Sequence, residues 1–218
     1  MNGDDIFFAL LSSLQPVELT TELLEHAYKA SFFPMADSDG CIAWHSPDPR
    51  AVFPLEHIRI AKSVRKLLEK GEFTVTVNQD FAGVIQACSR KSLGDDADVW
   101  ISDEIIRAYT DLHREGSAHS VEVWRDGRLA GGLYGVSFGA AFFGESMFSE
   151  VSNASKVAFA FLVQRLRERE YKLLDTQYAN HFTLQLGAIE VPRQEYVRML
   201  DHALSMQCAF DDRGRYEM

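Results

Sequence analysis

The stretch "HSVEVWRDGRLAGGLYGV", residues 119–136, decides the fold of this chain. It holds two strand-forming runs separated by Asp126-Gly127, a dipeptide that favours a type I′ turn because both positions require positive φ. Such a turn joins two antiparallel neighbours in a sheet. The stretch therefore predicts a β-hairpin.

The segments after the hairpin predict a mixed sheet. A strand is expected in "GAAFFGESMFS" (139–149), then a helix that starts near Ser152 or Asn153, then a strand in "YKLLDTQ" (171–177). Two further helices are expected in 179–187 and from Pro192 onwards. An antiparallel hairpin followed by strand, helix and strand indicates the α+β class, with a mixed sheet flanked by helices.

The part before the hairpin divides into two regions. Residues 16–30 predict an amphipathic helix, whereas residues 31–54 are rich in Pro, Asp, Ser and Gly and predict a loop with one short strand around Ile42. A strand in 71–79 and a helix with Ser102 or Asp103 as its N-cap come later. We therefore expect a small N-terminal domain, residues 1–52, beside a larger domain, residues 53–218.

Composition limits the class of protein. The chain has 218 residues, of which 46% are hydrophobic and 25% are charged, so it can bury a real core without disulfides. Its three cysteines are widely spaced, its first residues lack a basic signal-peptide region, and no apolar run reaches the length of a membrane span. These features favour a cytoplasmic protein with no membrane partner.

The sequence contains no recognisable cofactor or metal motif. Walker and GxGxxG loops are missing, and His45, His119 and His181 lack the spacing of zinc ligands. No serine lies in a GxSxG elbow, so nucleophilic catalysis lacks support. We expect no cofactor and no metal.

A basic segment stands out because the net charge of the chain is −10. Residues 57–70 carry five cations: Arg59, Lys62, Arg65, Lys66 and Lys70. In a helix, the three lysines fall four residues apart on one face. Either this is a solvated helix face or it is a stripe that binds phosphates.

Three polar residues stand next to apolar runs. Asp175 and Gln177 follow a strand-like pair of leucines, and residues two apart on a strand point to the same side. Glu145 lies among aromatic and thioether side chains, where an unpaired carboxylate would be costly. Each could be structural: Asp175 as a helix cap, Gln177 as a loop residue, Glu145 as a carboxylate held by backbone or arginine.

Five strings, in this order and spacing, resemble the leucyl/phenylalanyl-tRNA-protein transferase family. They are "WHSPDPRAV" (44–52), "VWISDEIIRAYTDLHREGSAHSVEVWRDGRLAGGLYGV" (99–136), "FFGESMFS" (142–149), "NASKVA" (153–158) and "LLDTQYANHFTLQLGAIEVPRQEY" (173–196). The resemblance implies a cytoplasmic, monomeric aminoacyltransferase of the N-end rule pathway. It would move Leu or Phe, with Met as a further candidate, from Leu-tRNA or Phe-tRNA to proteins that begin with Lys or Arg. It also implies that the larger domain has a GNAT-like acyltransferase fold.

The resemblance also assigns roles to residues. It implies that Asp175 and Gln177 are the catalytic acid and amide, and that Glu145 contacts the aminoacyl-adenosine. Other residues are implied to bind this substrate: Trp100, Tyr109, His45, Asn180, and an apolar amino-acid pocket formed by Leu133, Phe142, Met147, Phe159, Leu162 and Leu174. The basic segment becomes the expected contact with the tRNA acceptor stem.

The N-terminal region departs from the family. A Gly-Gly-Asp-Leu stretch is missing, "SFFPM" (31–35) replaces "GIFPW", and His45 stands where Trp is common. Two other functions stay open. One is a GNAT acetyltransferase that uses acetyl-CoA, for which "RLAGGL" (128–133) only approaches the pyrophosphate-loop pattern. The other is a tRNA-binding module without catalytic activity.

Overall fold

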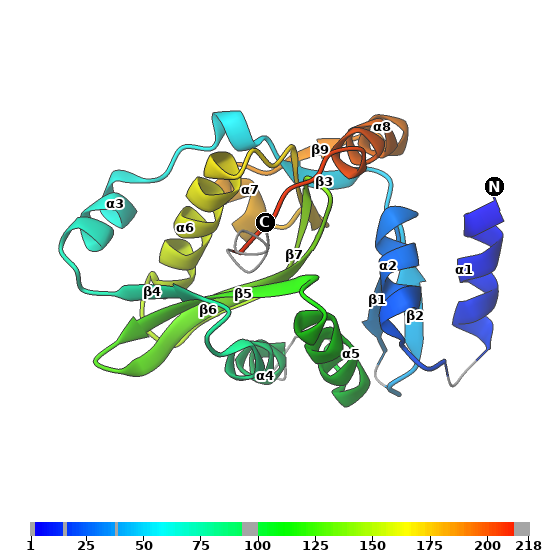
Figure 1. The fold of residues 1–218 in the computed structure, drawn as a ribbon, viewed down its shortest axis with the longest axis horizontal. Coiled ribbons are helices and arrows are strands. Elements are labelled where there is room, and N and C mark those ends of the chain that lie inside the picture. Colours follow the sequence, from blue (N-terminus) through cyan, green and yellow to red (C-terminus); the bar gives the residue numbers. More distant parts are fainter. Residues whose placement is uncertain (1–2, 15–16, 38, 93–99, 212–218) are drawn as a thin grey trace, which may run out of the picture.

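A seven-stranded sheet lies at the centre of the computed structural model, which describes residues 3–14, 17–37, 39–92 and 100–211 (Figure 1). Its strands are β3 (Arg50–Phe53), β4 (Thr74–Val77), β5 (Ala118–Arg125), β6 (Arg128–Phe138), β7 (Ala141–Ser149), β8 (Leu173–Gln177) and β9 (Ile189–Val191). They are ordered β4-β5-β6-β7-β8-β3-β9. The predicted mixed α+β class is confirmed, because β7 and β8 pair in parallel while the other neighbours are antiparallel.

The predicted hairpin is confirmed at the β5–β6 connection. Asp126 and Gly127 both have positive φ, 52° and 72°, and the flanking residues Arg125 and Arg128 pair across the turn. β6 then continues into β7, and these two strands make the long central part of the sheet. β8 pairs in parallel with the first half of β7, which places the end of β8 beside the middle of β7.

Helices cover both faces of the sheet. α4 (Phe81–Ser92) and α5 (Asp103–Arg114) pack against one face, and α6 (Ala154–Glu168) packs against the other (Figure 1). Ser102 caps α5 by accepting a hydrogen bond from the Ile105 amide, as predicted. The remaining helices of this part are α3 (Lys62–Glu69), α7 (His181–Leu186), α8 (Arg193–Leu204) and a short 3₁₀ turn, η1 (Leu55–His57).

The N-terminal part contains more structure than the sequence predicts. It holds α1 (Gly3–Ser13), α2 (Thr21–Lys29) and a two-stranded sheet of β1 (Phe33–Ala36) and β2 (Ile42–His45). The strand expected around Ile42 is confirmed as β2, whereas the loop expected over the rest of 31–54 is wrong, since β1 and β3 also lie within it. Pro34 argues against a strand because proline has no backbone N–H to donate. β1 pairs only with β2, however, and an edge strand tolerates the missing donor.

The larger sheet begins earlier than expected. β3 starts at Arg50 and lies between β8 and β9, so the predicted boundary after residue 52 falls inside this strand. Arg50 thereby comes into the core of the larger sheet. Within the described residues, none of the helices combines the length and the apolar character needed to cross a bilayer.

Candidate active site

A cavity of about 380 Å³ opens where β8 ends beside the middle of β7, next to the N-terminal part. Ten of the residues implied by the sequence line it: Trp100, Leu133, Glu145, Met147, Phe159, Leu162, Leu174, Asp175, Gln177 and Asn180. Its wall also contains aromatic and thioether residues that the sequence did not indicate: Phe33, Met35, Phe53, Tyr134, Tyr178 and Phe182. One hollow therefore joins polar groups from two strands with an extensive apolar surface.

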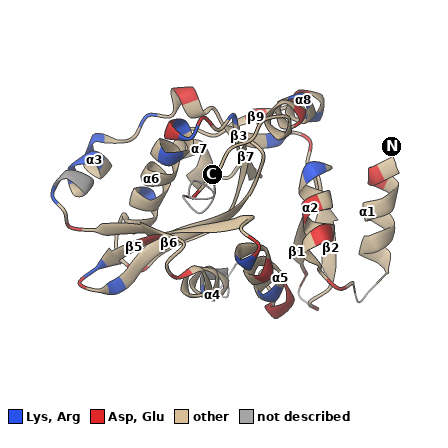
Figure 2. Cartoon of the chain, viewed as in Figure 1, with Lys and Arg blue, Asp and Glu red and all other residues tan. Residues whose placement is uncertain are grey.

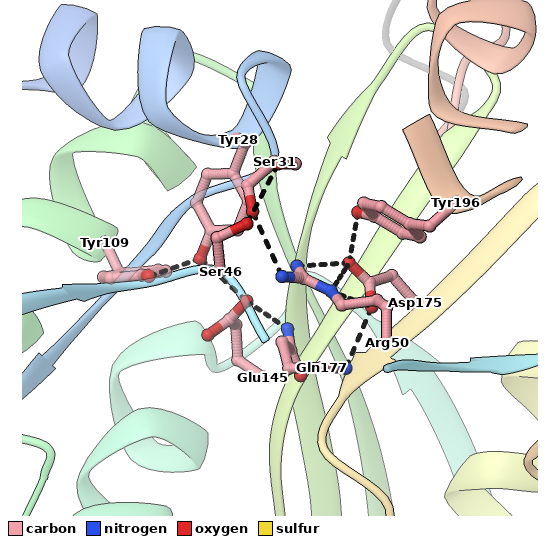
Figure 3. Close-up of polar contacts among 9 residues, drawn as sticks. All are labelled: Tyr28, Ser31, Ser46, Arg50, Tyr109, Glu145, Asp175, Gln177 and Tyr196. Carbon is pink, nitrogen blue, oxygen red and sulfur yellow. Dashed lines mark hydrogen bonds and ion pairs between the residues drawn. The ribbon is translucent and has the colours of Figure 1, made fainter. Parts of the chain in front are cut away.

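Parallel pairing of β7 with β8 brings Glu145 close to Gln177. Phe143 is in register with Asp175, so two positions further on Glu145, in the middle of β7, lies beside Gln177, at the end of β8. The Gln177 side-chain amide donates a hydrogen bond of 3.1 Å from Nε2 to Oε1 of Glu145 (Figure 3). The carboxamide and the carboxylate thus form one polar group on the cavity wall.

Asp175 is held by a buried arginine. Arg50 Nη2 lies 2.7 Å from Asp175 Oδ2, and Arg50 Nε donates to Oδ1 at 3.0 Å (Figure 3). The Tyr196 hydroxyl donates to Oδ2 at 2.6 Å, and the Gln177 backbone amide donates to Oδ1 at 2.9 Å. Both Asp175 oxygens are therefore engaged inside the protein, and Asp175 is fully buried.

Arg50 is itself enclosed by the N-terminal part and by α8. Its guanidinium lies 4.8 Å from the Phe33 ring centre and 4.7 Å from the Tyr196 ring centre, and Nη1 donates to the Ser31 carbonyl at 3.1 Å. Burial disfavours the charged guanidinium, but the charge and hydrogen bonds of Asp175, together with Tyr196 and Glu145, outweigh burial and raise the pKa of Arg50. The ion pair thus connects β3 to the end of β8.

Gln177 ends β8 in a left-handed backbone conformation. Its φ is 59°, which is uncommon for a residue other than glycine. The hydrogen bond that its backbone N–H donates to Asp175 Oδ1 stabilises the turn. The partner strand β3 is irregular at the same place, between Ala51 and Val52. The turn directs the Gln177 side chain toward Glu145.

The carboxyl group of Glu145 has a raised pKa. Burial raises its carboxyl pKa to about 8, and the nearby Asp175 acts in the same direction, while the Tyr28 hydrogen bond and Arg50 act against it. The Tyr28 hydroxyl donates to Oε1 at 2.7 Å and is in turn hydrogen-bonded to the Tyr109 hydroxyl. Glu145 is partly exposed and lines the cavity. Glu145 can therefore gain or lose a proton near neutral pH.

The apolar part of the cavity comes from three elements besides β7. Leu133 lies on β6, Phe159 and Leu162 lie on α6, and Leu174 lies on β8, one residue before Asp175. Met147 of β7 completes this group. An apolar side chain can be buried here within reach of the Glu145–Gln177 pair.

Three residues implied as substrate contacts lie elsewhere. Phe142 is fully buried, stacks on Phe210 at 4.9 Å, and is not among the described residues that line the cavity. Tyr109 lies behind the wall and reaches Glu145 through Tyr28. His45 stands outside, where its Nδ1 is 3.1 Å from the hydroxyl of Tyr178, a lining residue.

The basic segment is exposed. Arg59, Lys62, Arg65, Lys66 and Lys70 all face solvent on or beside α3, where Figure 2 shows a group of basic residues. Lys70 lies one residue beyond the end of α3, and its Nζ is 3.7 Å from Glu72. The other four form no ion pair with any residue that the structure describes.

The sequence did not single out Arg50, Tyr28 and Tyr196, although they hold the polar groups in place. These residues are separated from Asp175 or Glu145 by 125, 117 and 21 positions, so no local spacing connects them. The one local signal was the charge of Arg50 at the start of the apolar run "RAVF". In the described part of the chain, no cluster of three or more His, Cys, Asp or Glu could hold a metal ion.

Known protein families and relatives match nearly the whole chain. The family described as "Leucyl/phenylalanyl-tRNA protein transferase" matches residues 52–201, and its N-terminal domain matches residues 17–48. Leucyl/phenylalanyl-tRNA–protein transferase of Gloeobacter violaceus is 50% identical over 195 residues, covering 89% of this chain and 98% of that protein. The protein of that name from Chlorobaculum tepidum is 50% identical over 194 residues, covering 88% and 99%.

Solved structures give weaker matches. The L-PGS structure from Bacillus licheniformis has 14% identity and a TM-score of 0.44, over 63% of this chain and 49% of that one. A ribosomal-protein-alanine N-acetyltransferase from Brucella melitensis has 14% identity and a TM-score of 0.37, over 52% and 86%.

Proposed function

The chain belongs to the leucyl/phenylalanyl-tRNA–protein transferase family, and we propose that it moves leucine or phenylalanine from tRNA to proteins that begin with lysine or arginine. It is an aminoacyltransferase: the acyl group leaves a tRNA ester and forms a peptide bond with a protein. The observation that carries the finer proposal is the Glu145–Gln177 pair beside the apolar wall of one cavity. We expect a cytoplasmic monomer that thereby marks its acceptor for degradation.

The apolar wall is the proposed site of the donor side chain. Leu133, Met147, Phe159, Leu162 and Leu174 surround it, and burying a leucine or phenylalanine side chain there gains about 1.5 to 3 kcal/mol. Isoleucine and valine carry their branch at Cβ, close to the reacting ester, where the polar residues leave less room. This favours Leu, Phe and the unbranched Met as donors.

Glu145 is the proposed proton acceptor in the transfer. The attacking α-amine has an ordinary pKa of about 7.7 to 8.0, so it must lose a proton before it attacks. Glu145 has a matching raised pKa, and a bound ammonium favours its carboxylate form. The Glu145 carboxylate takes one proton from the ammonium and releases it to solvent, and the free amine attacks the ester carbon to form the C–N bond. The attacking nitrogen then gives its second proton to the Glu145 carboxylate, which passes it to the departing ribose oxygen as the ester C–O bond breaks.

Gln177 is the proposed orienting group. Its Nε2 already donates to Glu145, and its side-chain oxygen is available to accept a hydrogen bond from the incoming amine. Asp175 shapes the turn that presents this amide, because it accepts the Gln177 backbone N–H. With both oxygens engaged by Arg50 and Tyr196, Asp175 is better suited to positioning Gln177 than to receiving the proton itself.

The adenosine end of the donor would leave the cavity along its aromatic rim. Trp100 and Tyr178 line the cavity there, His45 lies next to Tyr178, and Asn180 caps α7 beside them. Aromatic rings stack on nucleobases without reading their sequence. Met35 also lines this part, at the position where the family pattern noted above ends in Trp.

The exposed cations of α3 are the proposed contact with the acceptor stem. Lys62, Arg65 and Lys66 are available to phosphates because no described acidic residue pairs with them. Such contacts are independent of sequence and fit a donor that is recognised in more than one tRNA.

Transfer assays with a set of donors test this function. The protein is incubated with radiolabelled Leu-tRNA, Phe-tRNA or acetyl-CoA and with two acceptors that differ only in beginning with Arg or with Asp. Labelling of the Arg acceptor from either tRNA, with no labelling from acetyl-CoA, supports the proposal. Labelling from acetyl-CoA alone would indicate an acetyltransferase, and tRNA binding without labelling would indicate an inactive module.

A further inference from the structure

A second hollow lies next to the cavity, between α3, α6 and α7. Its volume is about 160 Å³, and Phe159 and Phe182 line both this hollow and the cavity. Arg59, which precedes α3, and Lys156, in the first turn of α6, lie on its wall together with Gln185 of α7. The second hollow is thus a neighbour of the proposed donor site on the side of α3.

The wall of the second hollow combines cations with apolar surface. Arg59 and Lys156 are exposed, come from two different elements, and form no ion pair with any residue in the described part of the chain. Phe182 is partly exposed and borders both spaces. The net charge of the chain is −10, so this local pair of free cations is not a general property of its surface.

This combination is the chemistry that single-stranded nucleic acid requires. Cations bind the backbone phosphates, and a half-exposed aromatic ring offers a stacking surface for a base of any sequence. A basic peptide would be repelled by the same two cations, so the acceptor's first residue is a poor fit here. The position between α3 and the cavity also fits a strand that runs from an acceptor stem to its esterified end.

We propose that the second hollow binds a nucleotide that precedes the terminal adenosine of the donor tRNA, with its phosphate against Arg59 and Lys156 and its base against Phe182. This inference rests on the proposed function, because it needs a tRNA donor whose end lies in the cavity. It assigns the second hollow to the single-stranded 3′ end, separate from the stem contact of α3. Phosphate recognition of this kind does not depend on the amino acid carried, so Leu-tRNA and Phe-tRNA should be affected equally.

The test compares two donors, one with and one without the upstream phosphates. Leu-tRNA and leucyl-adenosine, which carries the same ester, are used with the double variant Arg59→Glu/Lys156→Glu. We expect KM for Leu-tRNA to rise about tenfold or more, and the slope of log KM against log salt to become shallower by about 2. With leucyl-adenosine, kcat/KM should stay within about twofold of wild type, since that donor cannot reach the second hollow.

The control is a double variant with the same charge change on the other face of the sheet. Arg107→Glu/Arg114→Glu alters two exposed arginines of α5 and should leave KM for Leu-tRNA within about twofold. The milder Arg59→Gln/Lys156→Gln variant should raise KM for Leu-tRNA by about two- to fivefold, which keeps the test available if the charge reversal unfolds the protein.

An unchanged KM for Leu-tRNA, or an equal loss with leucyl-adenosine, would overturn the inference. Failure of the proposed function would give a different result. If the protein is not such a transferase, the wild-type protein itself will not transfer leucine from Leu-tRNA, and no variant is needed to see this.

Discussion

Gln177 donates its side-chain amide to the Glu145 carboxylate at 3.1 Å, although 32 residues separate the two. The parallel pairing of β7 with β8 and the left-handed turn at Gln177 create this contact. A carboxylate with a raised pKa and an amide of fixed direction then share one wall of an apolar cavity. Such a pair can accept the proton of an amine and hold that amine in place.

The raised pKa of Glu145 predicts how transfer depends on pH. Only the carboxylate accepts a proton, and burial raises its pKa to about 8, so kcat/KM for the acceptor should rise with pH up to about 8. In Glu145→Gln the carboxylate's share of this rise should be lost and only the deprotonation of the acceptor's own amine should remain, with kcat/KM lower by about 10² at pH 8. The measurement is kcat/KM for the acceptor between pH 6 and 9.5, and an identical profile in both proteins would contradict the assignment.

The ion pair between Arg50 and Asp175 predicts a large effect on stability. Asp175→Asn leaves the Arg50 charge buried without its partner, so the free energy of unfolding should fall by about 3 to 5 kcal/mol. The matched control is Asp111→Asn, which breaks the exposed pair with Arg114 and should cost less than about 1 kcal/mol. Urea denaturation measures both, and similar losses in the two variants would show that the buried pair is not critical.

The apolar wall predicts a change in donor preference. Leu133→Phe narrows the cavity, so transfer of phenylalanine should lose about tenfold more kcat/KM than transfer of leucine. Phe142→Leu is the control, because Phe142 stacks on Phe210 away from the cavity. This substitution should lower the stability of the fold and leave the ratio of leucine to phenylalanine transfer unchanged. Competition between Leu-tRNA and Phe-tRNA in one reaction measures this ratio. A shift caused by Phe142→Leu and not by Leu133→Phe would refute this placement of the donor side chain.

The cations of α3 predict salt-dependent binding of tRNA. Replacing Lys62, Lys66 and Lys70 with Ala should make the slope of log affinity against log salt shallower by about 2 to 3. The contribution of Lys70 should be the smallest because Glu72 lies 3.7 Å from it. Filter binding of uncharged tRNA across a range of salt concentrations gives the slope. An unchanged slope would place the tRNA elsewhere.

Elements with strong local signals could be predicted from the sequence. Asp126-Gly127 fixes the hairpin, and the cap at Ser102 fixes the start of α5, because each is decided by its own neighbours. β1 and β3 escaped prediction because Pro34 and Pro49 make their surroundings look like a loop. Their strand character comes from pairing with β2, β8 and β9, which no short window of sequence contains.

The same division applies to the candidate site. Asp175, Gln177 and Glu145 could be singled out because a polar residue beside an apolar run is a local contrast, while their roles came from resemblance to a family. Arg50 and Tyr28 contribute through contacts across more than 100 positions, which only the folded chain displays. Phe142 and Leu133 look alike in the sequence, and only the structure separates a core residue from a lining residue.

The most direct test of the central claim is the single-turnover rate of leucine transfer from Leu-tRNA to a peptide that begins with Arg. The wild-type protein should carry out this transfer. Gln177→Ala should be slower by about 10² or more, because the amine then lacks the group that orients it beside Glu145. Transfer by Gln177→Ala within about threefold of wild type would contradict the account.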